Sequence, residues 1–554
     1  MSQFPKNELA QLTIASCVAN NIEHVVISPG SRNAPLTIGF KNHNSIKAYS
    51  VVDERCSAFF ALGMAQQLQK PVAIVCTSGS ALLNYYPAIA EAFYSNIPLV
   101  VISADRPRHL IDIGDGQTIR QENVFENHIL ESISLDDRLN INGNIQEMLF
   151  ETIKIAILKK GPVHINIPFD EPLYETTKDI LTLETVDNSF EEEPLDVDYL
   201  DSFAKIWNTS EKKIVLVGEH FPSELLQIQL EHLTKDPSVL VLIENTGNVS
   251  HSKFINSIDK LIFPLEDDLL TQFQPDILLS LGGLIVSKKI KQHLRKYKPK
   301  HHWHVDGKRA FDTYQCLSKH FKISPELFFS QFFFLTKPKQ SNFSSFWLQK
   351  KELRLKKHHE FLKNCDYSDL KTIDVVLKSI PDNSQVQIAN SSVIRYTQLF
   401  NINKSLRIFC NRGTSGIDGS TSTAIGASVI VKSNTVFLTG DISFFYDSNA
   451  LWNNYIPKTF RIVLVNNSGG GIFRFLPGPQ KTNALDYFET PHNLTAQHLC
   501  KMYNFEYFSV QNEEELKNEL NDFYSTSERP KLLEVFTPQQ ENDKILKAYF
   551  NNLK

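Results

Sequence analysis

Two polar residues stand at the ends of neighbouring apolar runs. Asp441 follows the run Val436–Leu438 by way of a glycine, and Asn467 follows the next apolar run, just ahead of the glycines 469–471. A carboxylate, an amide oxygen and the carbonyl of a glycine-rich turn are hard ligands that suit Mg²⁺ shared with phosphate oxygens, and glycines let the backbone approach a diphosphate closely. Asp441 alone could equally close a turn or cap a helix. The pair therefore indicates a metal and diphosphate site, which the single residue would not.

A further acid, Glu54, stands in the stretch VVDERCSAFFALG, at the start of a helical pattern over 54–69. The first turn of a helix favours any acid through the helix dipole, so a purely structural role is the alternative. About 26 residues separate Asp441 from Asn467, and this spacing is the signature of thiamine-diphosphate sites. Such an enzyme needs one glutamate to protonate the pyrimidine ring of the cofactor and so to generate the base that activates it. Glu54, far upstream at the end of a strand, suits that role.

The composition places these residues in an ordinary globular protein. A chain of 554 residues is too long for one hydrophobic core, so we expect about two to four domains. A net charge of −5 gives no basic field for nucleic acid. The N-terminus lacks the pattern of a signal peptide, and no apolar stretch approaches the roughly 20 residues of a membrane span. The seven cysteines are scattered without a C-x-x-C pair, which argues against a disulfide framework or a zinc cluster. We expect a soluble, cytoplasmic protein with no nucleic-acid partner and no stable membrane insertion.

Short apolar runs alternate with helical patterns, which is typical of doubly wound α/β units with mostly parallel sheets. We expect three such domains, at 1–180, 181–345 and 346–554. The predicted strands are 24–27, 72–75, 99–102 and 163–167 in the first domain, 213–218, 239–243 and 276–282 in the second, and 386–388, 407–409, 436–438, 461–465 and 532–536 in the third. Ligands of open α/β sheets bind beyond the carboxyl ends of the strands, which is where Glu54, Asp441 and Asn467 stand.

Three further stretches have less specific interpretations. The polar and acidic stretch 174–199 predicts a linker. His301, His302 and His304 invite a metal site, but alternating histidines beside an apolar residue favour a strand at the rim of a sheet. The basic run 350–359 predicts the solvated face of a helix.

Several motifs together resemble a single family. They are Ser28–Leu36 (SPGSRNAPL), Asp53–Arg55 (DER), Cys76–Ser80 (CTSGS), Ala104–Pro107 (ADRP), Gly116–Gln121 (GQTIRQ) and Asn411–Gly419 (NRGTSGIDG). In this order they are similar to the 2-succinyl-5-enolpyruvyl-6-hydroxy-3-cyclohexene-1-carboxylate (SEPHCHC) synthases, the thiamine-diphosphate enzymes of menaquinone biosynthesis. The first and last motifs separate this family from the decarboxylases and acetolactate synthases. The resemblance spans both outer domains, is loose in the central one, and implies the thiamine-diphosphate-binding fold.

The resemblance implies a role for each matching residue. Glu54 would activate thiamine diphosphate, and Gln117 would contact the reacting intermediate. Mg²⁺, or Mn²⁺ in its place, would be held by Asp441, Asn467 and the carbonyl of Gly469. The cofactor would further contact Thr77, Ser391, Ile417, Gly440, Ile442, Ser443 and Ile472. The substrates would contact Ser31, Arg32, Arg106, Gln117, Lys288, Lys289, Arg395, Arg412, Phe473 and Leu476.

The basic residues in this set also make sense from their chemistry. The substrates of the family, 2-oxoglutarate and isochorismate, carry two carboxylates each, and several fixed cations are needed to gather them beside a diphosphate. Taken singly, each arginine could be a surface residue or one half of an ion pair, and Arg395 could simply lie on a helix face. Two residues depart from the family pattern. Lys289 replaces an arginine, which keeps the charge but loses the bidentate geometry, and Ser468 replaces an asparagine beside the retained Asn467.

We therefore predict a homo-oligomeric transferase, a dimer or a tetramer, with its active site between subunits. The resemblance implies decarboxylation of 2-oxoglutarate and conjugate addition of the resulting succinyl-semialdehyde carbanion to isochorismate, which gives SEPHCHC and CO₂. The alternative within the superfamily is another 2-oxo-acid decarboxylase or an acetolactate-type synthase, which could dispense with the arginines. The alternative from a different class is a non-catalytic nucleotide-binding module, in which Glu54 would have no role.

Overall fold

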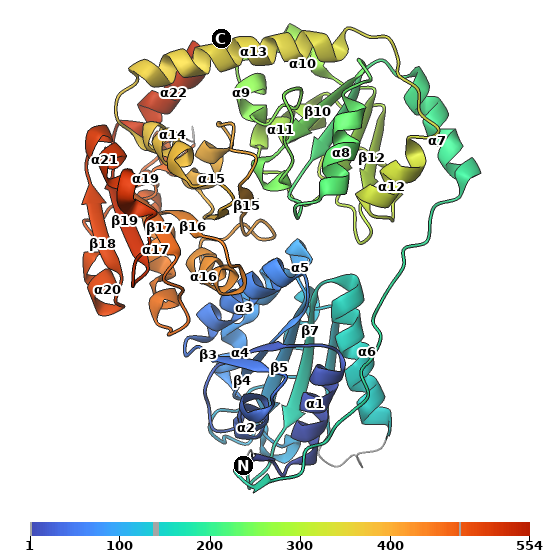
Figure 1. Cartoon of the computed structure of the whole chain (residues 1–554), viewed down its shortest axis with the longest axis vertical. Helices are drawn as coiled ribbons and strands as arrows, with labels where there is room; N and C mark the ends of the chain where they lie inside the picture. Colours follow the sequence, from blue (N-terminus) through green and yellow to red (C-terminus); the bar gives the residue numbers. More distant parts are fainter. Residues whose placement is uncertain (1–2, 137–142, 476–477) are drawn as a thin grey trace.

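Three parallel β-sheets form the centres of three α/β units in the computed structural model, which describes residues 3–136, 143–475 and 478–554 (Figure 1). The first unit, in blue and cyan, lies below the third, in orange and red, and the second, in green, lies beside the third. The three doubly wound α/β units predicted from the sequence are therefore confirmed. The central strands of each sheet are continuous apolar runs, as expected for strands that helices cover on both faces.

The first sheet has the strand order β3-β2-β4-β5-β7-β6. Its strands are β2 (His24–Ile27), β3 (Lys47–Ser50), β4 (Val72–Cys76), β5 (Leu99–Asp105), β6 (Glu131–Ser134) and β7 (Pro162–Pro168). Its helices are α1 (Glu8–Ala19), α2 (Ala34–Asn42), α3 (Glu54–Leu68), α4 (Ser80–Asn84), α5 (Tyr86–Ser95) and α6 (Gly143–Lys159). A short antiparallel pair, β1 (Phe4–Pro5) with β8 (Thr176–Thr177), lies beside this sheet near the N-terminus.

The third sheet repeats that topology. Its order is β15-β14-β16-β17-β19-β18, so strands numbered within their own sheet read 2-1-3-4-6-5 in both cases. The strands are β14 (Gln385–Ile388), β15 (Arg407–Phe409), β16 (Thr435–Gly440), β17 (Phe460–Asn466), β18 (Glu506–Val510) and β19 (Lys531–Phe536). The helices are α14 (Asp369–Ser379), α15 (Ser392–Thr397), α16 (Ser420–Ile430), α17 (Asp441–Tyr446), α18 (Ile472–Phe475), α19 (Leu485–Glu489), α20 (Gln497–Met502), α21 (Glu513–Phe523) and α22 (Asn542–Asn552).

The second sheet is smaller and has the order β10-β9-β11-β12-β13. Its strands are β9 (Lys213–Val217), β10 (Val239–Ile243), β11 (Ile277–Leu281), β12 (His301–Val305) and β13 (Leu317–Phe321). Its helices are α7 (Val197–Thr209), α8 (Glu224–Leu233), α9 (Ile258–Ile262), α10 (Asp267–Phe273), α11 (Lys288–Lys296) and α12 (Pro325–Phe332). The long helix α13 (Phe343–Asn364) then leads along the top of Figure 1 into the third unit. Short 3₁₀ turns lie at Arg108–Leu110, Glu126–His128, Asn245–Gly247, Ser448–Leu451 and Pro479–Lys481.

Helices α3 and α16 join the first and third units by a close crossing between them (Figure 1). Each follows the second strand of its own sheet. A Cβ atom on Gly63 of α3 would overlap the Thr423 carbonyl of α16, and a Cβ atom on Gly426 of α16 would overlap the Phe60 carbonyl of α3. The two backbones can approach this closely because both helices carry glycine at the contact.

The predicted strands are confirmed to within three residues at their ends. The histidine stretch is a strand, β12, as expected, but it does not lie at the rim of its sheet, because it pairs with β11 on one side and β13 on the other. His302 and His304 both hydrogen-bond the Ser280 hydroxyl. Within the described ranges no group of three or more His, Cys, Asp or Glu side chains could hold a metal. All seven cysteines are free thiols, and no helix in the described part of the chain is long and apolar enough to cross a membrane.

Two further predictions need correction. The linker is shorter than predicted at both ends. Its first part contains β8, which pairs with β1, and α7 already begins at Val197, where the Asp196 side chain caps it by accepting from the Tyr199 amide at 2.8 Å. The basic run 350–359 is helical, as predicted, but it is not wholly solvated. Arg354 and His358 are buried because this face of α13 packs on the C-terminal helix, where Arg354 donates to the Lys554 carbonyl and His358 bonds the Tyr549 hydroxyl. The domain boundaries at 180/181 and 345/346 stay predictions.

Candidate active site

A cavity of about 160 Å³ opens at the carboxyl ends of β14, β16 and β17. Its lining residues within the described chain all come from the third unit, between Asp369 and Phe488. Nine residues predicted from the sequence are among them: Ser391, Ile417, Gly440, Asp441, Ile442, Ser443, Asn467, Gly469 and Phe473. The fold therefore brings residues separated by more than 80 positions to one edge of one sheet, where ligands of such sheets bind.

Asp441 is the first residue of α17 and is only 3% exposed. One carboxylate oxygen accepts from the Ile442 amide at 2.7 Å, and the other accepts from the Gly469 amide at 3.0 Å. Gly469 has a φ of 148°, and a Cβ atom there would come within 2.6 Å of the Glu489 carbonyl oxygen. Only glycine allows this turn, so the glycine run holds the loop after β17 against the Asp441 carboxylate.

Asn467 follows β17 and lines the same cavity. Its amide nitrogen donates to a carboxylate oxygen of Asp369 at 2.9 Å. Its amide oxygen is buried and has no hydrogen-bond partner within the described residues. A buried acceptor without a partner is costly, and a bound cation removes that cost. The Asp441 carboxylate and the Asn467 amide oxygen are donors that fit Mg²⁺ or Mn²⁺.

Asp369 was not predicted from the sequence. It is the first residue of α14 and is buried. Burial raises its pKa to about 6, and the nearby Asp441 carboxylate adds to the rise, while hydrogen bonds from Thr537 and Asn467 oppose it. No sequence signal marks this residue, because it lies almost a hundred positions before Asn467 and meets it only through packing.

The remaining cavity residues shape its walls. The Ile417 carbonyl accepts from the Ser443 hydroxyl at 3.1 Å, which ties the loop before α16 to α17. Ser391 precedes α15 with a φ of 72°, an unusual conformation for a residue with a side chain. Phe473 packs against Phe488 with ring centroids 5.2 Å apart. Ile472 is half-buried in α18 beside the cavity but is not among its lining residues. Leu476 lies outside the described residues.

Glu54 belongs to the first unit, where it follows β3 at the carboxyl edge of the sheet. It begins α3, whose preceding residue Asp53 caps the helix by accepting from the Cys56 amide at 3.0 Å. Glu54 is half-buried and accepts from the Asn84 amide at 3.2 Å. It is not among the residues that line the 160 Å³ cavity of the same chain. The structure thus places Glu54 and Asp441 at equivalent edges of two different sheets.

Two arginines also follow strands of the first sheet, Arg32 after β2 and Arg106 after β5. Arg32 is 5% exposed and donates to the Phe169 carbonyl at 2.9 Å, and its pKa is lowered by burial and by the charge of Arg106. Arg106 follows β5 and donates to the Gly116 carbonyl at 3.1 Å. Of the other predicted residues here, Ser31 and Gln117 are exposed, and Thr77 is buried with no hydrogen-bond partner for its hydroxyl within the described residues.

A second arginine pair belongs to the third unit. Arg412 is buried and donates to the Asn390 side-chain oxygen at 2.7 Å. The pKa of Arg395 is lowered by burial and by the charge of Arg412. The Nε atoms of all four arginines are buried without a partner among the described residues, but Arg55 and Arg354 share this feature. The free Nε atom is therefore not specific to these arginines. Arg32 and Arg106 also lie near carboxylates of the chain, Glu171 at 3.5 Å and Asp115 at 3.8 Å.

The two lysines of α11 lie differently. Both are exposed at the start of that helix. The ammonium of Lys289 lies 4.6 Å from the Phe263 ring centroid, and Phe263 stacks on Phe550 of α22. Lys289 thus lies on a ring of the second unit that packs against the third, and no contact in the described structure brings either lysine to the cavity.

Glu91 of α5 was also missed by sequence reasoning. It is 1% exposed, and its carboxylate accepts from the Gly413 and Thr414 amides at 2.7 and 2.6 Å and from the Thr414 hydroxyl at 2.8 Å. This first-unit acid therefore fixes the loop that carries Arg412. It lies in the middle of an apolar helix with no motif around it, so no sequence signal marks it.

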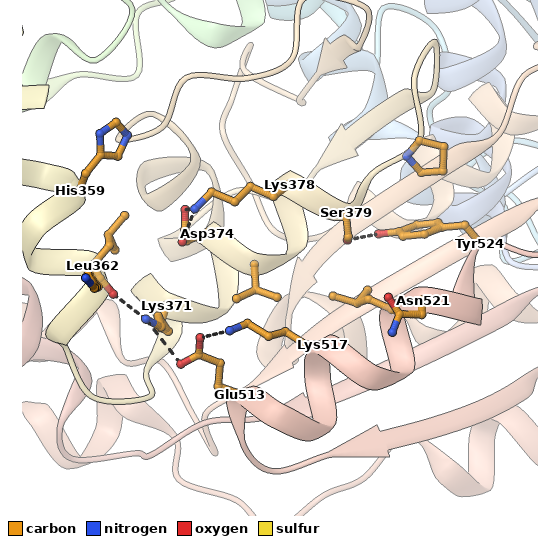
Figure 2. A pocket seen from close by; sticks show the side chains of 14 residues that line it. His359, Leu362, Lys371, Asp374, Lys378, Ser379, Glu513, Lys517, Asn521 and Tyr524 are labelled. Atoms are coloured by element: carbon orange, nitrogen blue, oxygen red, sulfur yellow. Dashed lines mark hydrogen bonds and ion pairs between the residues drawn. The ribbon is translucent and has the colours of Figure 1, made fainter. Parts of the chain in front are cut away.

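A larger cavity, of about 970 Å³, lies elsewhere (Figure 2). It is a surface groove between α13, α14 and α21, and none of the predicted site residues lines it. Its carboxylates are already paired, since Asp374 bonds Lys378 and Glu513 bonds Lys517, as Figure 2 shows. Size alone does not identify the site, because the smaller cavity is the one with unsatisfied buried groups.

Comparisons with known proteins identify the family of the chain. Residues 7–131 match the family model described as thiamine pyrophosphate enzyme, N-terminal TPP binding domain. The chain is 53% identical to the 2-succinyl-5-enolpyruvyl-6-hydroxy-3-cyclohexene-1-carboxylate synthases of Flavobacterium psychrophilum and Flavobacterium johnsoniae, with 99% of this chain and 100% of each relative covered. It is 36% identical to the synthase of the same name from Porphyromonas gingivalis, over 96% of this chain and 94% of the relative. The crystal structure of benzoylformate decarboxylase from Polynucleobacter necessarius superposes with a TM-score of 0.72 at 15% identity, over 96% of this chain and 99% of that one, and so shares the fold.

Proposed function

The chain belongs to the SEPHCHC synthase family, and we propose that it catalyses the reaction for which the family is named, in menaquinone biosynthesis. The observation that carries this proposal is the 53% identity, which extends over 99% of the chain rather than over the cofactor-binding regions alone. The substrates are then 2-oxoglutarate and isochorismate, and the products are SEPHCHC and CO₂. The enzyme is a transferase.

Thiamine diphosphate, when bound, supplies the electron sink for decarboxylation of a 2-oxo acid. The 160 Å³ cavity is our proposed place for its diphosphate, with the metal on Asp441, Asn467 and the Gly469 carbonyl. In support, the Asn467 oxygen is buried without a partner within the described residues, and the glycine turn places the Gly469 amide on the Asp441 carboxylate. Ile417 and Phe473 supply apolar walls that keep water from the reacting atoms.

Glu54 is our proposed acid for the pyrimidine end of the cofactor. Its carboxylate is oriented by the hydrogen bond that it accepts from the Asn84 side-chain amide. It would hold a proton at the ring nitrogen and return it during turnover. Because Glu54 does not line the cavity of its own chain, the proposal requires a second copy to bring the two together.

The active site therefore lies between two copies of the chain in a homo-oligomer. Residues 1–180 form the pyrimidine-binding domain of one copy, and residues 346–554 form the diphosphate-binding and metal-binding domain of the other, while 181–345 form the central domain. We further assign the protein to the cytoplasm, in support of which all seven cysteines are free thiols.

The arginine pairs bind the substrate carboxylates in this proposal. Arg106 and Arg412 lower the pKa of Arg32 and Arg395 respectively, so a bound carboxylate would reduce the concentration of positive charge at each pair. Gln117 and Ser31, exposed beside the first pair, would complete the contacts to the substrates. Lys289 extends the positive charge on the side of the third unit.

The test is a coupled product assay on purified protein with thiamine diphosphate and Mg²⁺. We expect CO₂ from 2-oxoglutarate together with SEPHCHC when isochorismate is present, and neither pyruvate nor benzoylformate should replace 2-oxoglutarate. Turnover of pyruvate or benzoylformate in preference would favour a different decarboxylase or an acetolactate-type synthase. Failure to form SEPHCHC from the two named substrates would overturn the proposal.

A further inference from the structure

We propose that Asp369 is a positioning residue for the metal site. Its carboxylate holds the side-chain amide of Asn467 so that the amide nitrogen faces α14 and the amide oxygen faces the cavity. The inference rests on the proposed function, because it concerns the cation that accompanies thiamine diphosphate. It adds a residue outside the motifs that identify the cofactor.

The hydrogen bond itself settles which end of the amide faces which way. An amide has one end that donates and one that accepts, whereas a carboxylate only accepts. The contact of 2.9 Å from Asn467 to an Asp369 oxygen must therefore use the amide nitrogen. The amide oxygen is left buried in the wall of the cavity, without a partner among the described residues. A ligand atom for a hard cation is thus presented in advance of the cation.

Asp369 is in turn held in place from two sides. Its second carboxylate oxygen accepts from the Thr537 hydroxyl at 2.6 Å, and its backbone amide donates to the Asn542 side-chain oxygen at 2.8 Å. Both carboxylate oxygens are therefore occupied by donors. Asp369 therefore acts through Asn467 rather than as a ligand itself.

A purely structural role is the competing explanation. Asp369 joins α14 to the segment after β19 through Thr537 and to the start of α22 through Asn542. If that were all it did, removing the Thr537 hydroxyl would disturb the molecule much as removing the Asp369 carboxylate does. Thr537→Val is therefore a matched control, since it removes a hydrogen bond from Asp369 but leaves the bond to Asn467.

The experiment measures Mn²⁺ binding to the full-length protein with thiamine diphosphate, by electron paramagnetic resonance of free Mn²⁺. Residues that orient a metal ligand typically contribute about 10–100-fold to metal affinity. We expect Asp369→Ala to weaken Mn²⁺ binding by that factor, while Thr537→Val keeps the wild-type affinity. The melting temperature of the cofactor-free protein shows that both variants fold.

A swap of the two side chains gives a second readout that a structural role would not produce. In Asp369→Asn with Asn467→Asp, residue 467 offers the cation an oxygen whichever way it turns, and the new amide can donate to it. We expect this double variant to bind Mn²⁺ more tightly than Asp369→Ala and to regain most of the wild-type affinity. The double variant keeps the same number of carboxylates in the cavity as the wild type. Its Mn²⁺ affinity can therefore be compared with that of the wild type even if Asp369→Ala does not fold.

The outcomes separate this inference from the proposed function. If the wild-type protein binds no Mn²⁺ with thiamine diphosphate, the proposed cofactor site is wrong and the inference falls with it. If the wild type binds but Asp369→Ala binds equally well, only the role of Asp369 is refuted. Equal losses in Asp369→Ala and Thr537→Val, or a swap no better than Asp369→Ala, would likewise refute it.

Discussion

The first and third sheets have the same strand order but carry different chemistry at their carboxyl ends. After the second strand, the first sheet has Glu54 where the third has Arg412, and after the fourth strand it has Arg106 where the third has Asn467. The third sheet forms a cavity with a buried oxygen that has no partner among the described residues, whereas the first presents the half-buried acid Glu54. The shared topology determines where ligands can bind, and the residue types at the strand ends determine which ones do.

The comparison also shows why neither sheet is a complete site. The described lining of the cavity comes from the third unit alone, and Glu54 lies outside it. The two units nevertheless meet in one chain through the glycine crossing of α3 and α16. That contact positions the two sheets relative to each other, but no residue of the first sheet lines the cavity of the third in the described structure. Substitutions can therefore change one sheet at a time, or the contact between the two sheets.

The largest effect is expected from Glu54→Gln on the first sheet. General acid–base catalysis contributes about 10²–10⁴-fold, so turnover should fall by that factor while the melting temperature stays unchanged. Steady-state product formation and thermal melting check this. Glu224→Gln, also at the first residue of a helix and exposed, is the matched control and should keep full activity. Loss of folding rather than of turnover in Glu54→Gln would mean that this glutamate is only a helix-terminal acid.

One arginine on each sheet tests the proposed substrate contacts. A hydrogen bond to a charged group contributes about 1.5–3 kcal/mol, or roughly 10–100-fold. We expect Arg106→Ala and Arg412→Ala each to raise KM for a carboxylate substrate by that factor, measured with the other substrate saturating. Arg120→Ala is the control, because Arg120 is 83% exposed and pairs only with Asp112 among the described residues. An unchanged KM for both substrates in either variant would remove that arginine from the site.

The contact between the two sheets can be broken separately. An alanine at Gly63 or Gly426 would place a Cβ atom against the backbone of the facing helix. Overpacking of this kind costs about 1–3 kcal/mol of the free energy of unfolding, which chemical denaturation would measure. Gly478→Ala is the control, since a Cβ atom there meets nothing within 4 Å and φ is −70°. Wild-type stability in both helix variants would show that the crossing can relax.

A buried acid at the same contact predicts a pH dependence. Asp447 accepts from the Ser422 amide of α16 at 2.7 Å and lies 3.5 Å from the Arg55 guanidinium of α3. Burial raises its pKa from 3.8 to about 7, although the Ser422 amide and Arg55 oppose the rise. The folded protein keeps this proton up to about pH 7, whereas the unfolded chain loses it near pH 4. The contribution to stability is therefore full below pH 4 and is lost as the pH rises to 7.

Asp447→Asn has no titrating group at this position. The melting temperature of the wild type relative to this variant should fall between pH 5 and pH 7 and stay level above about pH 8. Melting curves at a series of pH values measure this difference. Parallel curves for the two proteins over the whole range would show that the carboxyl does not titrate there.

The sequence allowed the fold to be predicted where strands are central and apolar. The strands β3, β6, β13 and β18 were missed because each lies at the edge of its sheet and carries polar residues, as in Lys47–Ser50 and Glu131–Ser134. Edge strands face helices less completely, so their sequences lack the continuous apolar run. The observed ends of the linker and of the helices differ from the predicted ends by a few residues, because a single capping side chain such as Asp196 decides where a helix begins.

The site divides in the same way. Asp441, Asn467 and Glu54 could be predicted because they directly follow strands in recognisable motifs. Asp369 and Glu91 could not, because each acts on a loop far away in sequence. Asp369 meets Asn467 across the packing of α14 on the sheet, and Glu91 meets Thr414 across the boundary between two units. A local sequence pattern cannot predict contacts between residues that are far apart in the chain.

The most direct test of the account is complementation between two inactive variants. Glu54→Gln disables the first-sheet contribution and Asp441→Asn the third-sheet contribution, so each alone should be inactive. Co-expressed with different tags and purified as the mixed assembly, they leave one intact site of every two, and we expect about half the wild-type activity. Continued inactivity of the mixed assembly would contradict a site built from the two sheets of different copies.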